Sequence, residues 1–305
     1  MDIDLNRVSA FMTANARLLD RRRFDLITGR GEADGVLGAL AAYRNDDGGF
    51  GWALEPDLRS PESQPVGALH AFEVLEEVAE YGGAAPGPTA VRLCDWLDSV
   101  TLPDGGVPFA LPVGEPTGTA PWWRQAGTEH SSLHLTCAVA GAAHLLGRYD
   151  AAVREHRWLE RATGYCMARI AAAERPAGSY ELRYVLSFLD AVHDVVPEAP
   201  GELRRMVGLL PDDGLLPVAG GADGEALHPL DYAPRPGTPL RGLLPGEVIE
   251  ADLDRLASRQ DDDGGWTVDF VSASTAGALE WRGHATVAAV KILLAHGADG
   301  RTEIG

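Results

Sequence analysis

The sequence predicts an all-α protein, an (α/α) toroid or barrel of about five to six helix-pair repeats with an inner apolar ring and an outer amphipathic ring. Two observations support this. A turn signature rich in aspartate and glycine recurs along the chain, and apolar helical stripes surround most of its copies. No segment alternates convincingly with the two-residue period of β-strands. The 305 residues, 45% of them hydrophobic, can bury one large core, so we predict a single domain over residues 1–305.

The repeated turn is clearest in two copies, Asn45-Asp-Asp-Gly-Gly-Phe50 and Asp261-Asp-Asp-Gly-Gly-Trp266, each of which follows an apolar helical stripe. Glycine can adopt positive φ and aspartate can bond free backbone amides, so each copy is expected to end a helix. Shorter copies and one degenerate copy lie between these two. The predicted turns are therefore near residues 46–50, 103–106, 175–180, 211–214 and 261–266.

The predicted inner helices, residues 63–81, 131–146, 180–196 and 285–294, are largely apolar, which is typical of buried helices. In the first of them, four glutamates lie on or near the face opposite the apolar stripe. The fourth unit instead continues into residues 215–244, which contain five prolines and no helical period. We expect an irregular loop that crosses or lines one mouth of the barrel, with an ordinary surface excursion as the alternative.

The string Gln260-Asp-Asp-Asp-Gly-Gly-Trp266 resembles the glutamine–tryptophan motif of squalene cyclases, and hence the terpene cyclase/prenyltransferase-repeat family. The resemblance covers roughly residues 30–296 and implies an (α/α)6 barrel. It also implies that Gln260 bonds the backbone at a neighbouring helix terminus and that Trp266 stacks on it, which are structural roles. The family's catalytic signatures, Asp-x-Asp-Asp, Asp-Asp-x-x-Asp and Asp-x-Cys, are absent, and the fold alone does not select a reaction.

The candidate catalytic residues are acidic. Glu55 and Asp57 lie in a segment whose path is fixed by prolines, and carboxylates held close together share a proton, which raises one pKa. Asp57 is thus the predicted proton donor, Glu55 its partner, and Asp231 in the long loop a third candidate. Arg59 is expected to clamp an anion or to orient the acid. The alternative is a polar linker with Ser63 as a helix N-cap.

The candidate substrate-binding residues combine aromatic rings with arginines. An aromatic face attracts a nearby cation, and an arginine within an apolar stripe needs either a carboxylate partner or a ligand. Trp122, Trp123 and Arg124 precede the second inner helix and could equally plug the barrel mouth. The candidates, besides Arg59, are Trp122, Trp123, Arg124, Tyr180, Arg183, Tyr184, Tyr232, Trp281 and Arg282.

The formal net charge of −19 argues against nucleic acid and anionic membrane surfaces as partners. The N-terminus is acidic where a signal peptide would be basic, and no apolar run is long enough to span a bilayer. The three cysteines lack the spacing of a disulfide framework or a zinc site. We therefore expect a cytoplasmic protein with no metal and no cofactor, whose partner is a hydrophobic small molecule such as an isoprenoid.

The resulting functional hypothesis is an isoprenoid-processing enzyme, similar to terpene cyclases, that protonates or cyclises a hydrophobic polyene in a central aromatic-lined cavity. One alternative is a non-catalytic module that binds a terpenoid, another hydrophobic ligand or a protein. Another is a carbohydrate-active (α/α)6-barrel enzyme. The first predicts one poorly solvated carboxylate, the second a filled or acid-free cavity, and the third an open cleft with two carboxyls ~5–9 Å apart.

Overall fold

The computed structural model describes residues 2–83, 87–114 and 117–301. Within these residues the protein is mostly helical, with fifteen α-helices and very little sheet, which confirms the all-α prediction. β1 (Asp2–Asp4) pairs in parallel with β4 (Asp299–Arg301), and β2 (Leu216–Pro217) pairs antiparallel with β3 (Ala226–Leu227). None of the helices in these ranges combines the length and hydropathy that a membrane span requires.

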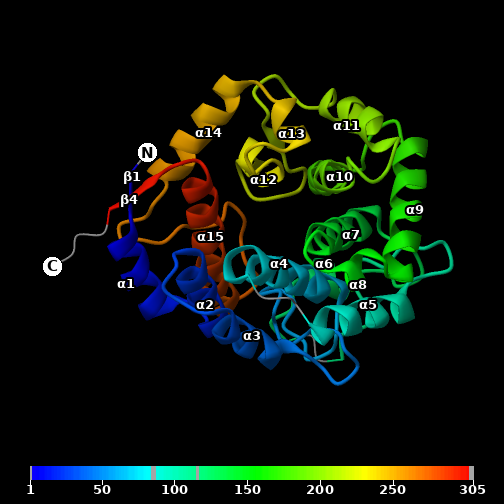
Figure 1. The fold of residues 1–305 in the computed structure, drawn as a ribbon, viewed down its shortest axis with the longest axis horizontal. Helices are drawn as coiled ribbons and strands as arrows, with labels where there is room; N and C mark the ends of the chain where they lie inside the picture. The colour runs from blue at the N-terminus through cyan, green and yellow to red at the C-terminus, as the bar shows by residue number, and fades with distance from the viewer. Residues whose placement is uncertain (1, 84–86, 115–116, 302–305) are drawn as a thin grey trace.

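The longer helices fall into two groups in Figure 1, one near the centre of the view and one at its periphery. We call the first group the inner helices: α4 (Pro65–Gly82), α7 (Leu133–Gly147), α10 (Ser179–Ala191) and α15 (Thr275–Ala295). The outer helices are α1 (Leu5–Asn15), α3 (Ala33–Leu40), α5 (Pro88–Val100), α9 (Arg157–Ala172), α11 (Ala199–Val207) and α14 (Gly246–Ser258).

Several shorter elements join the two groups. α2 (Leu18–Ile27) packs against both α4 and α15 and so links the first and last inner helices. α12 (Pro229–Tyr232) packs against α10 and α14. The remaining helical elements are η1 (Ala41–Tyr43), α6 (Pro121–Arg124), α8 (Ala151–Arg154) and α13 (Pro239–Gly242).

The first two aspartate–glycine turns are each fastened to the residue that leads into the next inner helix. Asp47 Oδ1 accepts hydrogen bonds from the Gly49 amide at 2.9 Å and from Ser63 Oγ at 2.8 Å, just before α4. Asp104 Oδ1 accepts from the Gly106 amide at 3.2 Å and from the Ser131 hydroxyl at 2.5 Å, just before α7. The aspartate thus closes its own turn and positions the helix that follows.

The same turns also pack on the next outer helix along the chain. Gly48, Gly105 and Gly264 all have φ of +95°, and a Cβ on each would press against a helix backbone: Arg92 of α5, Arg161 of α9 and Arg7 of α1. Only glycine tolerates this conformation and this close approach together. The last turn therefore contacts α1, the first helix of the chain, in the same way that the earlier turns contact α5 and α9.

The Gln260–Trp266 string makes the same junction with side chains. Gln260 Nε2 donates to the Asp4 carbonyl, at the start of α1, at 3.4 Å and to the Gly264 carbonyl at 3.1 Å. The buried Trp266 indole donates to the Leu256 carbonyl of α14 at 2.8 Å. The string therefore holds the end of α14 against the beginning of α1.

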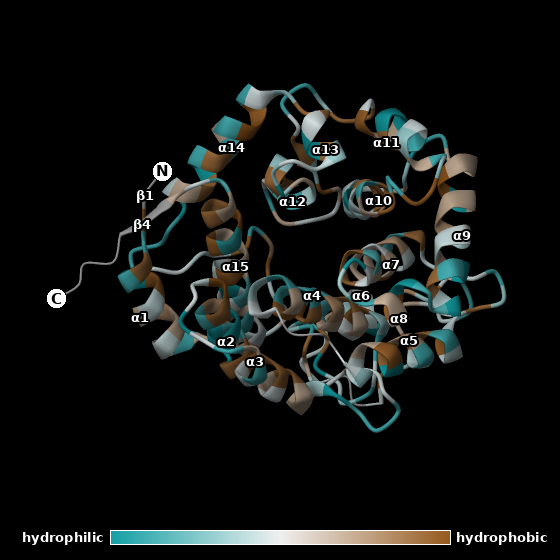
Figure 2. Cartoon of the chain, viewed as in Figure 1, coloured by the Kyte–Doolittle hydropathy of each residue, from teal (hydrophilic) through white to brown (hydrophobic). Residues whose placement is uncertain are grey.

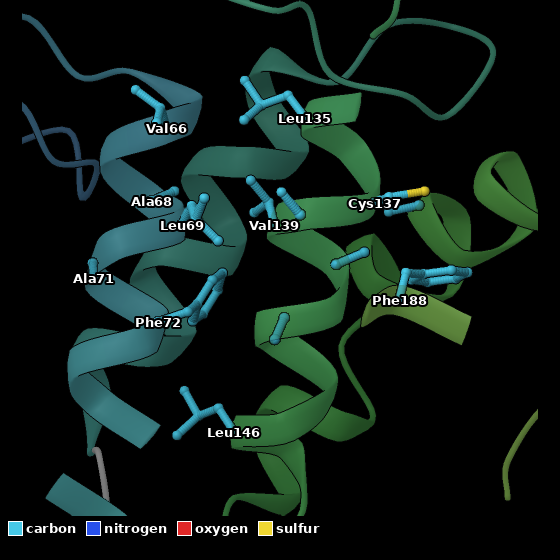
Figure 3. Close-up of a cluster of buried hydrophobic side chains, with 14 of the residues drawn as sticks. Val66, Ala68, Leu69, Ala71, Phe72, Leu135, Cys137, Val139, Leu146 and Phe188 are labelled. Carbon is cyan, nitrogen blue, oxygen red and sulfur yellow. The ribbon is translucent and has the colours of Figure 1, made fainter. Parts of the chain in front are cut away.

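The inner helices run parallel. In Figure 3 the first turns of α4 and α7, with Val66 and Leu135, lie at one end and Leu146 at the other. His70 lies beside Trp281 and His284, while Glu77 lies beside Lys291, so α15 runs in the same direction as α4. The parallel arrangement places the N-terminal ends of four inner helices at one level and their C-terminal ends at another.

The structure corrects three details of the sequence prediction. α15 begins ten residues before the predicted start, because Ser274 caps it by accepting from the Gly277 amide at 3.0 Å. Residues 215–244 are not a structureless loop, since they hold the β2–β3 hairpin, α12 and α13. The inner helices also mix polar with apolar residues (Figure 2), and Glu76 and Glu77 of α4 are only 3% exposed.

Candidate functional site

The region between the inner helices, here called the centre, carries two sets of polar side chains. The N-terminal level contains His70 and Glu73 of α4, His134 of α7, Arg183 and Tyr184 of α10, and Trp281 and His284 of α15. The C-terminal level contains Glu76, Glu77 and Glu80 of α4, Lys291 of α15, and Arg235 from the segment that follows α12. The two levels differ in how fully their charges are paired.

His70 lies between two carboxylates. Its Nε2 is 2.9 Å from Glu55 Oε2 and its Nδ1 is 2.8 Å from Glu73 Oε2. Burial alone would lower the pKa of His70, but the charges and hydrogen bonds of Glu73 and Glu55 outweigh it and raise the pKa to about 9. His70 is therefore an imidazolium at neutral pH, and both of its N–H groups donate to carboxylates.

The two carboxylates that flank His70 differ in access. Glu55 is buried, whereas 38% of the Glu73 side chain is exposed. Burial would raise the pKa of Glu73, but the charge of His70 outweighs it and the pKa lies at about 2. Glu73 also interacts electrostatically with Arg183 and His284. It is thus an ionised, accessible carboxylate that faces several helices at once.

Aromatic rings of α15 lie next to His70. The ring centroid of His284 is 5.5 Å and that of Trp281 is 6.2 Å from the His70 ring. Burial and the nearby Arg23 hold the pKa of His284 well below its usual value. Arg23 Nη1 lies 3.3 Å from His284 Nδ1, and since a guanidinium can only donate, Nδ1 accepts and the proton is on Nε2. His284 is therefore a neutral ring.

A second aromatic group belongs to α7 and α10. The His134 ring stacks on Tyr184 with centroids 4.9 Å apart and meets Phe109 at 5.5 Å. Phe109 in turn stacks on Trp123 at 4.6 Å. Burial and the charge of Arg183 lower the pKa of His134 to about 4, so this ring is also neutral near pH 7. The N-terminal level thus has aromatic faces on two sides.

Arg183 is the least satisfied charge of the N-terminal level. Its guanidinium carbon lies 5.0 Å from the centroid of the Tyr184 ring, in cation–π distance. Among the described residues its guanidinium has neither a hydrogen bond nor an ion pair, although Asp231 and Glu73 attract it from farther away. The side chain is half-buried on the face of α10 that also carries Tyr184.

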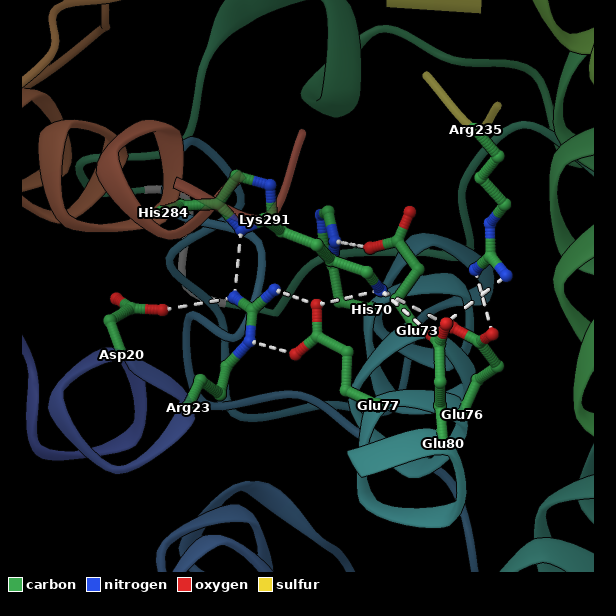
Figure 4. Close-up of polar contacts among 10 residues, drawn as sticks. All are labelled: Asp20, Arg23, His70, Glu73, Glu76, Glu77, Glu80, Arg235, His284 and Lys291. Atoms are coloured by element: carbon green, nitrogen blue, oxygen red, sulfur yellow. Dashed lines mark hydrogen bonds and ion pairs between the residues drawn. The ribbon is translucent and has the colours of Figure 1, made fainter. Parts of the chain in front are cut away.

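At the C-terminal level every charged group has a partner. Arg23 Nε and Nη2 bind the two oxygens of Glu77 at 2.8 and 3.0 Å, and Arg23 Nη1 reaches Asp20 at 3.2 Å. Lys291 Nζ lies 3.4 Å from Glu77 and 3.5 Å from Glu76. Figure 4 shows how these groups form one continuous network.

Arg235 extends this network to the segment after α12. Its guanidinium binds Glu76 at 2.7 Å and lies 3.9 Å from Glu80. The predicted loop 215–244 therefore reaches from the fourth unit to α4 of the first unit. This contact places part of residues 215–244 at the C-terminal level.

Asp57, the predicted proton donor, bonds both α15 and the segment that leads into it. Its carboxylate is 2% exposed and accepts from Ser272 Oγ at 2.6 Å, the Ala273 amide at 2.9 Å and Trp281 Nε1 at 2.8 Å. Asp57 therefore fixes the segment that leads into α15.

The other acidic candidate, Asp231, and the predicted anion clamp, Arg59, are also occupied. Asp231 Oδ2 accepts from the His228 amide at 2.7 Å and completes the capping box of α12. Arg59 binds both oxygens of Glu280, at 2.6 and 3.2 Å. Both side chains are therefore bonded to other groups of the protein.

Several other predicted binding residues are exposed or contact groups of the protein. Trp122 is 48% exposed and Arg124 is also on the surface, whereas Trp123 is buried against Phe109. Tyr232 is buried and donates its hydroxyl to the Gly214 carbonyl at 2.8 Å.

Arg282 and Tyr180 also bond protein groups. Arg282 binds Asp261 and Asp263 in the last turn, at 2.9 and 2.8 Å. Tyr180 donates to Glu225 Oε1 at 3.0 Å. Of the sequence candidates, the structure brings Glu55, Arg183, Tyr184 and Trp281 to the N-terminal level.

The sequence prediction missed His70, Glu73, His134 and His284. His70 and Glu73 are three residues apart on α4, a spacing at which side chains meet on one helix face. That spacing was the available signal for the pair. Within the described residues, no group of three or more His, Cys, Asp or Glu side chains is arranged to hold a metal ion.

Comparison with known proteins adds a likeness of fold. No family model and no curated protein matches the chain. Among solved structures, the chain is similar to a protein from Actinoplanes, with a TM-score of 0.55 and 15% sequence identity over 95% of this chain and 98% of that one. At this identity the likeness shows a shared fold over nearly the whole length of both chains.

Proposed function

We propose that the inner and outer helices form a closed (α/α) toroid of the terpene cyclase/prenyltransferase-repeat type. Three contacts support closure. Gly264 packs on α1 as Gly48 packs on α5, Gln260 bonds the start of α1, and β1 pairs with β4. Each unit then covers the next, and the last covers the first.

We further propose that the N-terminal level is the site of an isoprenoid-processing enzyme that cyclises a polyene. The observation that carries this proposal is Glu73, an accessible carboxylate with a pKa of about 2 that faces the centre between two aromatic groups. In this proposal the bond between carbon and the diphosphate oxygen of a prenyl diphosphate breaks, the diphosphate leaves with the bonding electrons, and the resulting allylic cation closes a ring on a double bond and then loses a proton. A fixed carboxylate and aromatic faces stabilise such charge, because they need not reorganise when it forms.

The geometry favours cyclisation over protonation of the polyene. Asp57 holds three donors, and both N–H groups of the His70 imidazolium are directed at carboxylates. Both N–H groups of His70 are therefore already bonded within the protein. In this proposal the Glu55–His70 pair orients Glu73, and Glu73 itself acts by its charge.

A non-catalytic binding module is the second candidate, and the pKa values favour it. The pKa of His70 is about 9, that of Glu73 about 2 and that of His134 about 4. A general acid or base works best when its pKa lies near the working pH, and none of these three does. A centre with these groups suits binding and electrostatic stabilisation.

The carbohydrate-enzyme alternative has less support. Glu55 and Glu73 lie on opposite sides of one imidazole and both bind it. Glycoside hydrolysis requires one carboxyl to donate a proton and the other to attack or to activate water. Glu55 is buried, so only Glu73 is open to a substrate, and a single carboxyl cannot fill both roles.

The test is a product screen. Purified protein is incubated with geranyl, farnesyl and geranylgeranyl diphosphates and with squalene, each with magnesium or EDTA, and products are analysed by gas chromatography–mass spectrometry. We expect a cyclised product whose rate of formation falls about 100-fold in Glu73→Gln, in the range for removing one group that stabilises transition-state charge. Glu160→Gln, on the exposed face of α9, is the matched control and should act like the wild type.

The opposite result is equally informative. If no substrate gives a product, while circular dichroism shows an intact helical fold, the enzyme proposal is rejected in favour of the binding module. Mass spectrometry of a ligand extracted from the purified protein would then identify what the centre holds.

A further inference from the structure

Arg183 differs from the other basic groups that surround the centre. Arg23 is paired with Glu77, Arg235 with Glu76, and Lys291 with both of these glutamates. Arg59 is paired with Glu280 and Arg17 with Asp20. Arg183 alone among these six has no ion pair or hydrogen bond to its guanidinium within the described residues.

Within the described residues, no carboxylate lies within ion-pair distance of the Arg183 guanidinium. Tyr184 covers it with a ring face, and the nearby Tyr180 hydroxyl is used by Glu225. Asp231 attracts Arg183 electrostatically but bonds the His228 amide and stays beyond ion-pair distance. A half-buried guanidinium without a counter-ion is costly, since the low-dielectric surroundings replace part of its hydration.

We infer that Arg183 binds an anionic oxygen group, a carboxylate or a phosphate, of the ligand at the centre. A guanidinium offers a planar fork of N–H donors that matches either group in a bidentate fashion. The protein as a whole carries a charge of −19 and repels anions, so an anionic ligand needs such a local unpaired cation. Tyr184 and His134 supply the wall against which the rest of the ligand packs.

Glu73 and Arg183 place opposite charges on two different helices of the site. Glu73 and Arg183 lie on α4 and α10 and interact electrostatically, with no ion pair between them. A bound molecule therefore meets a negative group from one helix and a positive group from another. This inference rests on the proposed function only in taking the N-terminal level as the place where the ligand binds.

The experiment is isothermal titration calorimetry with inorganic phosphate, pyrophosphate, acetate, farnesyl diphosphate and farnesol. The proteins compared are the wild type, Arg183→Gln, Arg183→Lys and the control Arg204→Gln, which changes an exposed arginine of α11. Circular dichroism and thermal unfolding confirm that each variant is folded. The acetate and phosphate arms distinguish the two anion classes.

We expect at least one anion to bind the wild type and Arg204→Gln equally, and Arg183→Gln to bind it about tenfold or more weakly, as for the loss of a charged hydrogen bond. Arg183→Lys should retain part of the affinity, because it keeps the charge but loses the fork. If no anion binds the wild type, or if Arg183→Gln binds as the wild type does, the inference is overturned.

The failure of this inference can be told from the failure of the proposed function. Binding of farnesol without any Arg183-dependent anion binding would overturn the anion site and leave the isoprenoid proposal standing. Suppose instead that phosphate or acetate binds through Arg183, that farnesyl diphosphate binds no more tightly than phosphate, and that farnesol does not bind. That result would support the anion site and reject the isoprenoid proposal.

Discussion

The two levels of the centre are built by the same helices, yet they treat charge in opposite ways. At the C-terminal level Arg23, Lys291 and Arg235 neutralise glutamates of α4 and so join α2, α4, α15 and the segment after α12. At the N-terminal level Glu73 is accessible and Arg183 has no ion pair within the described residues. Charges that face the centre therefore hold helices together where they pair, at the C-terminal level. Where they do not pair, at the N-terminal level, we propose that they serve a ligand.

The largest loss of stability is expected when the ion-pair network of the C-terminal level is broken. Arg23→Met leaves the buried Glu77 without the guanidinium that binds both of its oxygens, and leaves Asp20 with Arg17 alone, which should lower the free energy of unfolding by about 3–5 kcal/mol. Urea denaturation followed by circular dichroism measures it. The control Arg161→Met removes an exposed partner of Asp98 and should cost less than about 1 kcal/mol. Equal losses in the two variants would contradict a structural role for the network.

A smaller, pH-dependent effect is expected at the N-terminal level. The pKa of His70 is raised, so its stabilisation is complete below its unfolded pKa of 6.5 and is lost as the pH rises through about 9. The pKa of Glu73 is lowered, so its stabilisation is complete above 4.5 and is lost as the pH falls through about 2. The pair should therefore stabilise the fold fully only between pH 4.5 and 6.5.

The measurement compares the urea unfolding of the wild type and His70→Gln at about pH 5.5 and about pH 10. Groups that titrate elsewhere change both proteins alike and cancel in the difference. The stability advantage of the wild type should be large at the lower pH and should shrink at the higher one. A constant advantage would show that His70 does not carry its proton between Glu55 and Glu73.

The helices and turns could be predicted because their signals are local. The Asp-Gly turns at 46–50 and 261–266 hold a positive-φ glycine where expected, and the 3.6-residue period located α4 and α7. The start of α15 was missed because residues 267–284 mix serine, glycine and apolar residues without a clear period, and its cap, Ser274, is a single residue.

The site was harder to predict, because its contacts connect distant parts of the chain. The helical spacing placed Arg183 and Tyr184 on one face, and the structure keeps them together. The glutamates of α4 were placed opposite the apolar stripe, a face that is normally solvated. An inner helix has a second face toward the centre, and Glu77 is neutralised there by Arg23 and Lys291, which no local pattern indicates.

The smallest effect on stability is expected from Trp122→Ala, which also tests how far the N-terminal site extends. Trp122 is 48% exposed, so its loss should change the free energy of unfolding by no more than about 0.5 kcal/mol and leave anion binding unchanged. The adjacent Trp123→Ala should cost about 3 kcal/mol, because it removes a buried ring that stacks on Phe109. If Trp122→Ala weakens binding as much as Arg183→Gln does, the ligand must extend beyond α7 and α10 to α6.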